Sequence, residues 1–258
     1  MTWKTKLTKI EEEREYIRGY ALSDLATKCS FVETIFLLWK GKLPTSAETK
    51  MLNALFTVSI DHGVGAPSTT VARTVASTGN SLHTALAAGI TALGELHGGA
   101  IENAAQFFDA YATIREDSPS TPSSKEGDIA NLVKKLLAQK IRFPGYGHKV
   151  LRHDHRSDML FAIAKETGFY GKHSVFAQAV EKELNATAKK ALPLNIDGAM
   201  AAIILDMGFD ATLAKGFFLV GRTPGLIAHI YEEKISKEGV RRIPESDIEY
   251  TGEKNKKL

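Results

Sequence analysis

Residues 143–148 form the stretch Phe-Pro-Gly-Tyr-Gly-His, which interrupts a chain whose hydrophobic pattern is otherwise helical. A proline and two glycines beside a histidine predict a loop whose backbone can come close to a ligand. The helical segments on either side would hold this loop in place, and binding groups concentrate on loops of that kind. We therefore take the loop as the first candidate for a functional site.

The segments on both sides of the loop predict a mostly α-helical protein. Residues 30–33, Ser-Phe-Val-Glu, and 45–48, Thr-Ser-Ala-Glu, are capping boxes, in which a hydroxyl residue is followed by glutamate three positions later. Apolar residues then recur at the spacing of a helix face, whereas the alternation typical of strands is nearly absent. The expected fold class is all-α. Helices are predicted over residues 31–39, 46–58, 81–96, 101–115, 128–140, 158–167, 175–189, 199–207 and 212–234.

One segment departs from this helical pattern. Residues 117–127, Asp-Ser-Pro-Ser-Thr-Pro-Ser-Ser-Lys-Glu-Gly, are rich in serine and proline. Such a composition predicts an exposed and mobile loop. We expect it to mark an edge of a subdomain.

The composition excludes several classes of protein. The chain has 258 residues, with 33 lysines and arginines against 30 aspartates and glutamates, and its single cysteine, Cys29, excludes a disulfide framework and a zinc-finger site. No apolar run is long enough to span a membrane, and the charged residues 1–14 do not resemble a secretory signal. The net charge of +3 comes without a basic stripe interleaved with aromatics, so nucleic-acid binding is not expected. The expected location is the cytoplasm.

Five glycine-containing breaks carry polar residues between the predicted helices. Backbone N–H groups at such junctions can approach a ligand closely. Each break by itself is also explained as a helix cap, but five breaks with histidine, aspartate or arginine favour a binding site. The breaks are residues 60–65, 95–100, 143–148, 194–198 and 220–225.

Metal binding is one alternative for these polar residues, because His62, His97, His148 and Asp197 have the chemistry to bind zinc or iron. The sequence contains no HExxH motif and no histidine pair at i, i+4 on an apolar helix face. The two histidines within residues 152–158 lie among charged neighbours, which indicates a solvated face. No metal site is expected. A serine nucleophile is not expected either, because no GxSxG motif occurs.

Six short motifs follow one another along the chain. They are Ile17-Arg18-Gly19-Tyr20 followed by Leu25-Ala26, Gly41-Lys42-Leu43-Pro44-Thr45, Leu96-His97-Gly98-Gly99-Ala100, Pro144-Gly145-Tyr146-Gly147-His148-Lys149-Val150-Leu151-Arg152, Asn195-Ile196-Asp197-Gly198, and Arg242-Ile243-Pro244 with Tyr250-Thr251-Gly252. Their composition and order resemble the citrate synthase superfamily. Each motif alone is weak evidence, whereas six in order cover nearly the whole chain and make the resemblance strong.

The length of the chain indicates which members of the superfamily it resembles most. Citrate synthases carry many more residues before the first of these motifs, which begins here at Ile17. The pattern is therefore most similar to citryl-CoA lyase and to the C-terminal citrate-synthase-like module of ATP citrate lyase. The resemblance implies a large helical domain, residues 1–145 and 211–258, and a small helical domain, residues 146–210, without an N-terminal extension.

The resemblance also implies an activity, the cleavage of citryl-CoA to acetyl-CoA and oxaloacetate. No metal or redox cofactor is expected, and none beyond the CoA moiety of the substrate. His148 would act at the hydroxyl oxygen, His97 would donate a hydrogen bond to the thioester oxygen, and Asp197 would exchange the proton at the acetyl carbon. An alternative for Asp197 is the N-cap of the helix that follows it.

The carboxylates of the citryl or oxaloacetate part call for arginine side chains, which bind them bidentately. The resemblance assigns this contact to Arg156, Arg222 and Arg242, with Arg242 supplied across a dimer. The resemblance implies His62 as a further carboxylate contact, and Arg73 is expected to support the pocket. An alternative for Arg156 is an ordinary surface charge, given its charged neighbours.

The CoA part requires cations for its phosphates and a backbone edge for adenine. Lys189 and Lys190 are expected to supply the cations, although lysines are also common at the C-terminus of any helix. The backbone edge is expected from the residues of the glycine-rich loop. These loop residues are Arg142, Pro144, Gly145, Tyr146 and Gly147.

The expected partners are citryl-CoA, acetyl-CoA, oxaloacetate and a second copy of the chain, because the family is built on helical dimers. A citryl-CoA synthetase is a candidate partner. The alanine-rich segments 69–76 and 81–96 are candidates for the dimer interface or for ordinary core helices. Two other functions remain alternatives: a short citrate or 2-methylcitrate synthase, and a non-catalytic helical module that binds a partner.

Overall fold

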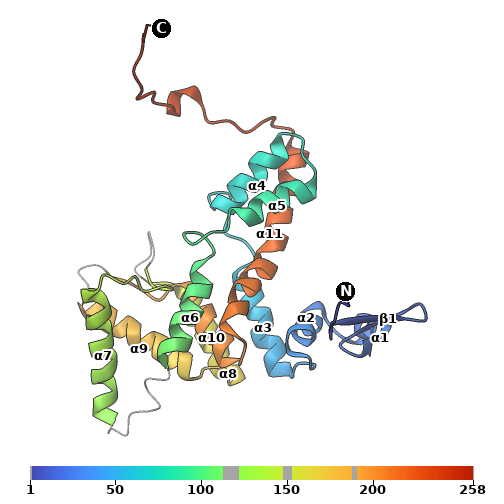
Figure 1. Cartoon of the computed structure of the whole chain (residues 1–258), viewed down its shortest axis with the longest axis vertical. Coiled ribbons are helices and arrows are strands. Elements are labelled where there is room, and N and C mark those ends of the chain that lie inside the picture. The colour runs from blue at the N-terminus through green and yellow to red at the C-terminus, as the bar shows by residue number, and fades with distance from the viewer. Residues whose placement is uncertain (1, 113–121, 148–152, 188–190, 258) are drawn as a thin grey trace. The chain divides into compact units, whose positions relative to one another are not determined.

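A computed structural model describes residues 2–112, 122–147, 153–187 and 191–257 of the chain (Figure 1). It is mostly helical, which confirms the expected fold class. The α-helices are α1 Leu22–Lys28, α2 Phe31–Lys40, α3 Ser46–Val58, α4 Pro67–Ser77, α5 Leu82–Thr91, α6 Ala100–Ala112, α7 Pro122–Ala138, α8 His155–Thr167, α9 Lys172–Thr187, α10 Ile196–Asp206 and α11 Ala214–Ser236. Two 3₁₀ turns, η2 Ala211–Leu213 and η3 Glu245–Asp247, complete the helical elements of the described residues.

A small antiparallel sheet near the N-terminus was not expected from the sequence. Its strands β1 Thr8–Glu11, β2 Arg14–Ile17 and β3 Tyr20–Ala21 lie in the order β1-β2-β3. Glu12 and Glu13 both adopt positive φ angles and form the tight turn between β1 and β2. The strands are short and largely exposed, so they have no buried face to impose the period-2 pattern on which the prediction relied.

Both capping boxes are present where the sequence predicts them. The Ser30 side chain accepts from the Glu33 N–H while the Glu33 carboxylate accepts from the Ser30 N–H, and Thr45 and Glu48 do the same at α3. Gly41 ends α2 in the left-handed conformation, with φ of 75°, that glycine adopts without strain. The sequence therefore determines the bounds of α2 and the start of α3 through local hydrogen bonds.

The helix α7 begins earlier than expected. Its first residue is Pro122, a residue well suited to the first position of a helix because its fixed φ is helical and its missing N–H needs no acceptor there. The prediction of a loop over residues 117–127 is therefore wrong for residues 122–127. Residues 117–121 lie outside the described residues.

Internal contacts divide the chain into two compact units. Unit 1 comprises residues 1–60 and 98–222, and unit 2 comprises residues 61–97 and 223–258. These bounds differ from those of the two expected domains. The assignment of residues 146–210 to a small domain of their own stays a prediction.

The centre of unit 1 is α10, which contacts α6, α8 and α9 (Figure 1). Every residue from Gly198 to Leu205 is buried, because this stretch has no polar side chain that would need water. An aromatic cluster of Trp39, Phe56, Phe209 and Phe217 packs in the same unit, with ring centroids 4.8–6.3 Å apart. Because the body of α10 is buried on all sides, the position of its N-terminus is fixed by the packing of the rest of the helix.

Unit 2 is built on the close packing of α4 against α5. A Cβ added at Gly89 would lie 2.9 Å from the Ala72 side chain, so glycine is needed for this approach. Ala76 and Ala85 are buried in the same core, together with Leu226 of α11. Core packing within the chain accounts for these small residues, and their role in a dimer interface stays a prediction. None of the described helices is long and apolar enough to cross a membrane.

Candidate active site

Two of the predicted glycine breaks meet in unit 1. The backbone N–H of Asn195 donates to the Gly145 carbonyl at 3.0 Å, and the Gly147 N–H donates to the Pro193 carbonyl at 2.7 Å. A Cβ added at Gly198 would lie 2.5 Å from the Gly145 oxygen, so both positions must be glycine for the backbones to approach this closely. The glycine-rich loop therefore lies directly against the N-terminus of α10.

Asn195 caps this end of α10, because its side chain accepts a hydrogen bond from the Gly198 N–H at 3.1 Å. Its amide nitrogen also donates to the Gly147 carbonyl at 3.1 Å. The alternative interpretation of Asp197 as the N-cap is therefore wrong. Asp197 lies in the first turn of the helix, and its carboxylate is left for another role.

The environment of Asp197 favours its neutral form. Burial raises the pKa of this carboxyl above its ordinary value, and the charge of Asp154 adds to the effect. The positive charges of Arg156 and Arg222 oppose the shift without cancelling it. Among the described residues, no group donates a hydrogen bond to the Asp197 side chain. A raised pKa keeps this carboxyl protonated to higher pH than an ordinary aspartate, which suits it to donate a proton.

Arg156 is held by a buried carboxylate beside it. Its Nε and Nη2 atoms donate to the two oxygens of Asp154, each at 2.9 Å. The Asp154 side chain is 1% exposed and the Arg156 side chain is 34% exposed. Arg156 therefore has a fixed and partly sheltered position, and its role as a carboxylate ligand stays a prediction beside that of a surface charge.

Arg222 is buried in α11, and its Nε donates to the Ser59 carbonyl at 2.8 Å. The guanidinium lies over the Phe218 ring, 4.8 Å from its centroid. A Cβ added at the preceding residue, Gly221, would lie 3.1 Å from the Phe56 carbonyl, so glycine lets α11 approach the end of α3. A buried arginine near Asp197 can attract an anionic ligand.

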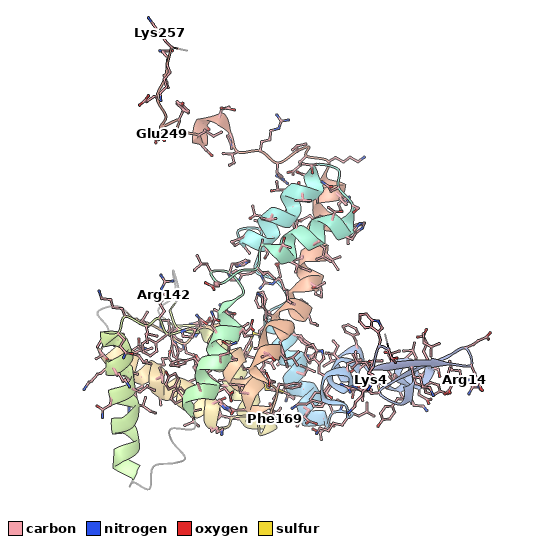
Figure 2. All side chains as sticks on the ribbon, in the orientation of Figure 1. Lys4, Arg14, Arg142, Phe169, Glu249 and Lys257 are labelled. Atoms are coloured by element: carbon pink, nitrogen blue, oxygen red, sulfur yellow. The ribbon has the colours of Figure 1, made fainter. Side chains whose placement is uncertain are left out.

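Several polar groups of the glycine-rich loop form hydrogen bonds with other residues of the chain. The Tyr146 hydroxyl donates to the Ala177 carbonyl at 2.8 Å, and burial raises the pKa of this phenol well above its usual range. The Tyr146 N–H donates to the Phe143 carbonyl at 3.4 Å. Arg142 is exposed at the start of the loop, as Figure 2 shows. The CoA contacts expected of this loop stay a prediction.

Unit 2 contains His97, whose ring caps a helix. The backbone N–H of Ser68, at the start of α4, donates to His97 Nε2 at 3.2 Å, and the Ser68 hydroxyl lies 2.9 Å from the same nitrogen. A ring nitrogen that accepts from an N–H carries no proton, so the neutral ring carries its proton on Nδ1. His97 is therefore oriented to act as a hydrogen-bond donor through Nδ1.

Of the other expected residues of unit 2, His62 and Arg242 lie on its surface, whereas Arg73 is half-buried. His62 is exposed, and Asp61 beside it pairs with His229, with Oδ1 and Nε2 3.0 Å apart. Arg242 is exposed as well. Arg73 is paired with Glu232 and Glu233, so it supports an ion-pair network.

Three expected residues, His148, Lys189 and Lys190, lie outside the described residues. Within the described part of the chain, one group of side chains has ligand atoms close enough to hold a metal ion. It consists of His153, His155 and Asp158, with ligand atoms within 4.8 Å of one another, and all three residues are exposed.

In unit 1 the fold thus brings Asp197, Arg156 and Arg222 close enough for their charges to interact, beside the glycine-rich loop. The sequence analysis missed Asp154 and Ser68, which orient Arg156 and His97. An aspartate two residues before the arginine and just ahead of a helix was the available signal for Asp154. Ser68 is distant from His97 in sequence, and no local pattern links them.

Comparison with known proteins identifies relatives of the whole chain. The family model for the C-terminal domain of citrate synthase matches it in two overlapping stretches, residues 1–52 and 46–243. The structure of citryl-CoA lyase from Hydrogenobacter thermophilus is 42% identical, covers 100% of this chain and 98% of that chain, and superposes with a TM-score of 0.90.

Two longer proteins are also similar. The structure of ATP citrate lyase from Methanothrix soehngenii in complex with citrate and coenzyme A is 25% identical, with a TM-score of 0.82 over 98% of this chain and 42% of that one. Citrate synthase 2 from Bacillus subtilis is 28% identical over 88% of this chain and 57% of its own length. The chain thus spans about half the length of these two relatives. The family model and the citryl-CoA lyase match together show that the chain belongs to the citrate synthase family.

Proposed function

We propose that the protein is a citryl-CoA lyase, a carbon–carbon lyase that cleaves citryl-CoA to acetyl-CoA and oxaloacetate. The observation that carries the proposal is the end-to-end likeness to the Hydrogenobacter thermophilus citryl-CoA lyase, at 42% identity. The similar ATP citrate lyase binds citrate and coenzyme A, which are the two components joined in citryl-CoA.

The cleavage needs three groups. A base takes the proton of the tertiary hydroxyl, and the oxygen electron pair forms the ketone of oxaloacetate while the carbon–carbon bond breaks. The electron pair of that bond passes into the enolate of acetyl-CoA, which needs a hydrogen-bond donor at the thioester oxygen. An acid then protonates the enolate carbon. We assign these roles to His148, His97 and Asp197, in that order.

The assignment of Asp197 as the acid is supported by its raised pKa. A carboxyl group that stays protonated at higher pH can give its proton to carbon and then regain one from solvent, while His148 releases the hydroxyl proton to solvent. The cap made by Asn195 supports the same role, because it spares Asp197 from hydrogen bonding to the helix.

The assignment of His97 as the thioester donor is supported by its tautomer. Ser68 engages Nε2, which makes Nδ1 the atom that donates. The charge on the thioester oxygen grows as the bond breaks, so a donor held in place contributes most in the transition state.

We assign the binding of the negatively charged groups of the substrate to arginine, histidine and lysine side chains. Arg156 and Arg222 are proposed to bind citryl carboxylates, with His62 and Arg242 as further contacts. Lys189 and Lys190 are proposed to bind CoA phosphates, and the loop from Arg142 to Gly147 is proposed to bind adenine. We also propose that the protein works as a homodimer or a multiple of dimers in the cytoplasm, and a citryl-CoA synthetase is a candidate partner.

A citrate synthase is the second candidate function, and the similarity to citrate synthase 2 from Bacillus subtilis favours it. The same side chains would serve condensation, followed by hydrolysis of the thioester. A 2-methylcitrate synthase is a variant of this candidate, and a non-catalytic partner-binding module is the third.

The test is incubation of the purified protein with citryl-CoA, with oxaloacetate coupled to NADH oxidation through malate dehydrogenase. A parallel reaction contains acetyl-CoA and oxaloacetate and measures the release of free thiol. NADH loss without thiol release is the expected result. Strong thiol release would instead identify a synthase, and the absence of both signals would favour the binding module.

A further inference from the structure

Asp154 is a buried carboxylate that the mechanism above does not use. Its side chain is 1% exposed and lies at the N-terminus of α8, two residues before Arg156. Its Oδ1 accepts from the Arg156 backbone N–H at 3.1 Å and from Nε at 2.9 Å, and its Oδ2 accepts from Nη2 at 2.9 Å. Both oxygens therefore hold one arginine.

The same carboxylate reaches the helix that carries Asp197. The backbone N–H of Ile196, the first residue of α10, donates to Asp154 Oδ2 at 3.0 Å. This N–H is one of those that a helix leaves without an acceptor of its own. Asp154 therefore joins the N-terminus of α8 to the N-terminus of α10 through one side chain.

The contact leaves an edge of the Arg156 guanidinium for another anion. A guanidinium has five N–H donors in one plane, and Asp154 takes the one on Nε and one on Nη2. In the part of the chain that the structure describes, no acceptor contacts Nη1. The edge formed by Nη1 and Nη2 has the geometry that binds a carboxylate bidentately.

Asp154 stays charged while it holds the arginine. Burial by itself would raise the pKa of this carboxyl, but the hydrogen bonds and charge of Arg156 and the Ile196 N–H hold it below the ordinary value. The ion pair therefore persists wherever the protein is folded near neutral pH. A neutral amide in this place would offer one acceptor oxygen instead of two.

We propose that Asp154 is a positioning residue for the cleavage reaction, which fixes the Arg156 guanidinium against the first turn of α10 and thereby fixes a substrate carboxylate relative to Asp197. This inference rests on the proposed function and adds a residue to it. Asp154 acts through Arg156 and does not touch the substrate.

The experiment is a double-mutant cycle between Asp154→Asn and Arg156→Ala, with kcat and KM for citryl-CoA measured for all four proteins. Asp154→Asn is expected to raise KM at least about tenfold and to change kcat less, because the lost anchor weakens the carboxylate contact. In the Arg156→Ala background the same substitution is expected to leave KM unchanged, since the residue it positions is absent.

Two further variants keep the test interpretable. Asp154→Ser retains a side-chain oxygen that can cap α8 but loses the charge and the second acceptor, so it replaces Asp154→Asn if that protein fails to fold. Asp210→Asn is the matched control, because Asp210 caps η2 in the same way, accepting from the Thr212 N–H at 2.8 Å, and is exposed. It is expected to keep the KM of the unaltered protein.

The outcomes separate this inference from the proposed function. A wild-type protein that cleaves citryl-CoA, with KM effects that multiply in the double variant, would overturn the positioning role alone and indicate a purely structural aspartate. If the wild type does not cleave citryl-CoA, the proposed function fails, and the dissociation constant of oxaloacetate in the same four proteins replaces KM. An unaltered protein that neither cleaves citryl-CoA nor binds oxaloacetate would overturn both.

Discussion

Gly145 and Gly198 lie in such close contact that a methyl group added at Gly145 would be 2.8 Å from the Gly198 Cα. Gly145 has a φ of +83°, so its backbone conformation also disfavours a side chain. This approach brings the glycine-rich loop against the N-terminus of α10, where Asp197 lies in the first turn of the buried helix. The geometry of the candidate site therefore depends on glycine at both positions, because a side chain at either one would push the loop and the helix apart.

Gly145→Ala tests that dependence. It is expected to lower the free energy of unfolding by about 3 kcal/mol, from backbone strain and overpacking together. Gly168→Ala is the matched control, because Gly168 has a φ of +81° but nothing within 4 Å of its added Cβ, and only about 1 kcal/mol is expected there. Urea unfolding of both variants measures the difference. Equal losses would mean that strain alone requires glycine at position 145.

Asp197→Asn is expected to reduce cleavage by about 10³-fold while making the fold more stable at neutral pH. The loss of rate follows from removing the proposed acid. The gain follows from the raised pKa: the contribution of a carboxyl with a raised folded pKa is present below its unfolded pKa and is lost as the pH rises through the folded pKa. The uncharged amide that the substitution introduces avoids that loss.

Urea unfolding of wild type and Asp197→Asn between pH 4 and neutral pH measures this effect. The stability difference is expected to be small at the acidic end and to grow as the pH rises. A difference independent of pH would contradict the raised pKa.

His97→Asn and His97→Gln separate the two ring nitrogens. The asparagine amide nitrogen lies near the position of Nδ1, whereas the glutamine side chain reaches the position of Nε2. If Nδ1 donates to the thioester, His97→Asn is expected to retain about tenfold more activity than His97→Gln, which keeps only the Ser68 contact. Steady-state cleavage of citryl-CoA provides the measurement. The opposite order of activities would place the catalytic proton on Nε2.

Glu233→Gln is expected to destabilise unit 2 by about 2 kcal/mol at neutral pH. The Glu233 side chain is 1% exposed and accepts from Arg241 Nε at 2.7 Å and Nη2 at 3.0 Å, and from Arg73 Nε at 2.7 Å. The hydrogen bonds from Arg241 lower the pKa of this carboxyl, and with the hydrogen bond from Arg73 they outweigh the opposing effect of burial. Its stabilising contribution is therefore present above the unfolded pKa and is lost as the pH falls through the folded pKa.

Thermal unfolding followed by circular dichroism at several pH values checks this expectation. The deficit of Glu233→Gln relative to wild type should shrink as the solution is acidified. Glu245→Gln, at an exposed glutamate in η3, is the control and is expected to unfold like the wild type. A deficit of equal size at every pH would show that charge at position 233 is not what stabilises the unit.

The helices could be predicted because their signals are local. The two capping boxes, Gly41 and the apolar spacing each act within one or two turns, so the sequence specifies α2 and the start of α3 without the rest of the chain. The small sheet could not be predicted in the same way, because its exposed strands carry no buried face. The start of α7 was misjudged since proline and serine also begin helices.

The candidate site was predicted only in part, for a related reason. Motif resemblance pointed to Arg156 and Asp197, but the contacts that orient such residues come from elsewhere in the chain. Asp154 reaches the Ile196 N–H across 42 positions, and Ser68 reaches His97 across 29. The spacing of apolar residues along the sequence cannot indicate a hydrogen bond between segments so far apart.

The placement of the two tryptophans has a practical consequence for all of these unfolding experiments. Trp39 packs in the aromatic cluster and Trp3 is 91% exposed, and both belong to unit 1. Because the sequence has no third tryptophan, tryptophan fluorescence does not directly detect the unfolding of α4 and α5 in unit 2. A fluorescence melting curve that coincides with the loss of total helix signal would indicate one cooperative transition, and separate curves would resolve the melting of each unit.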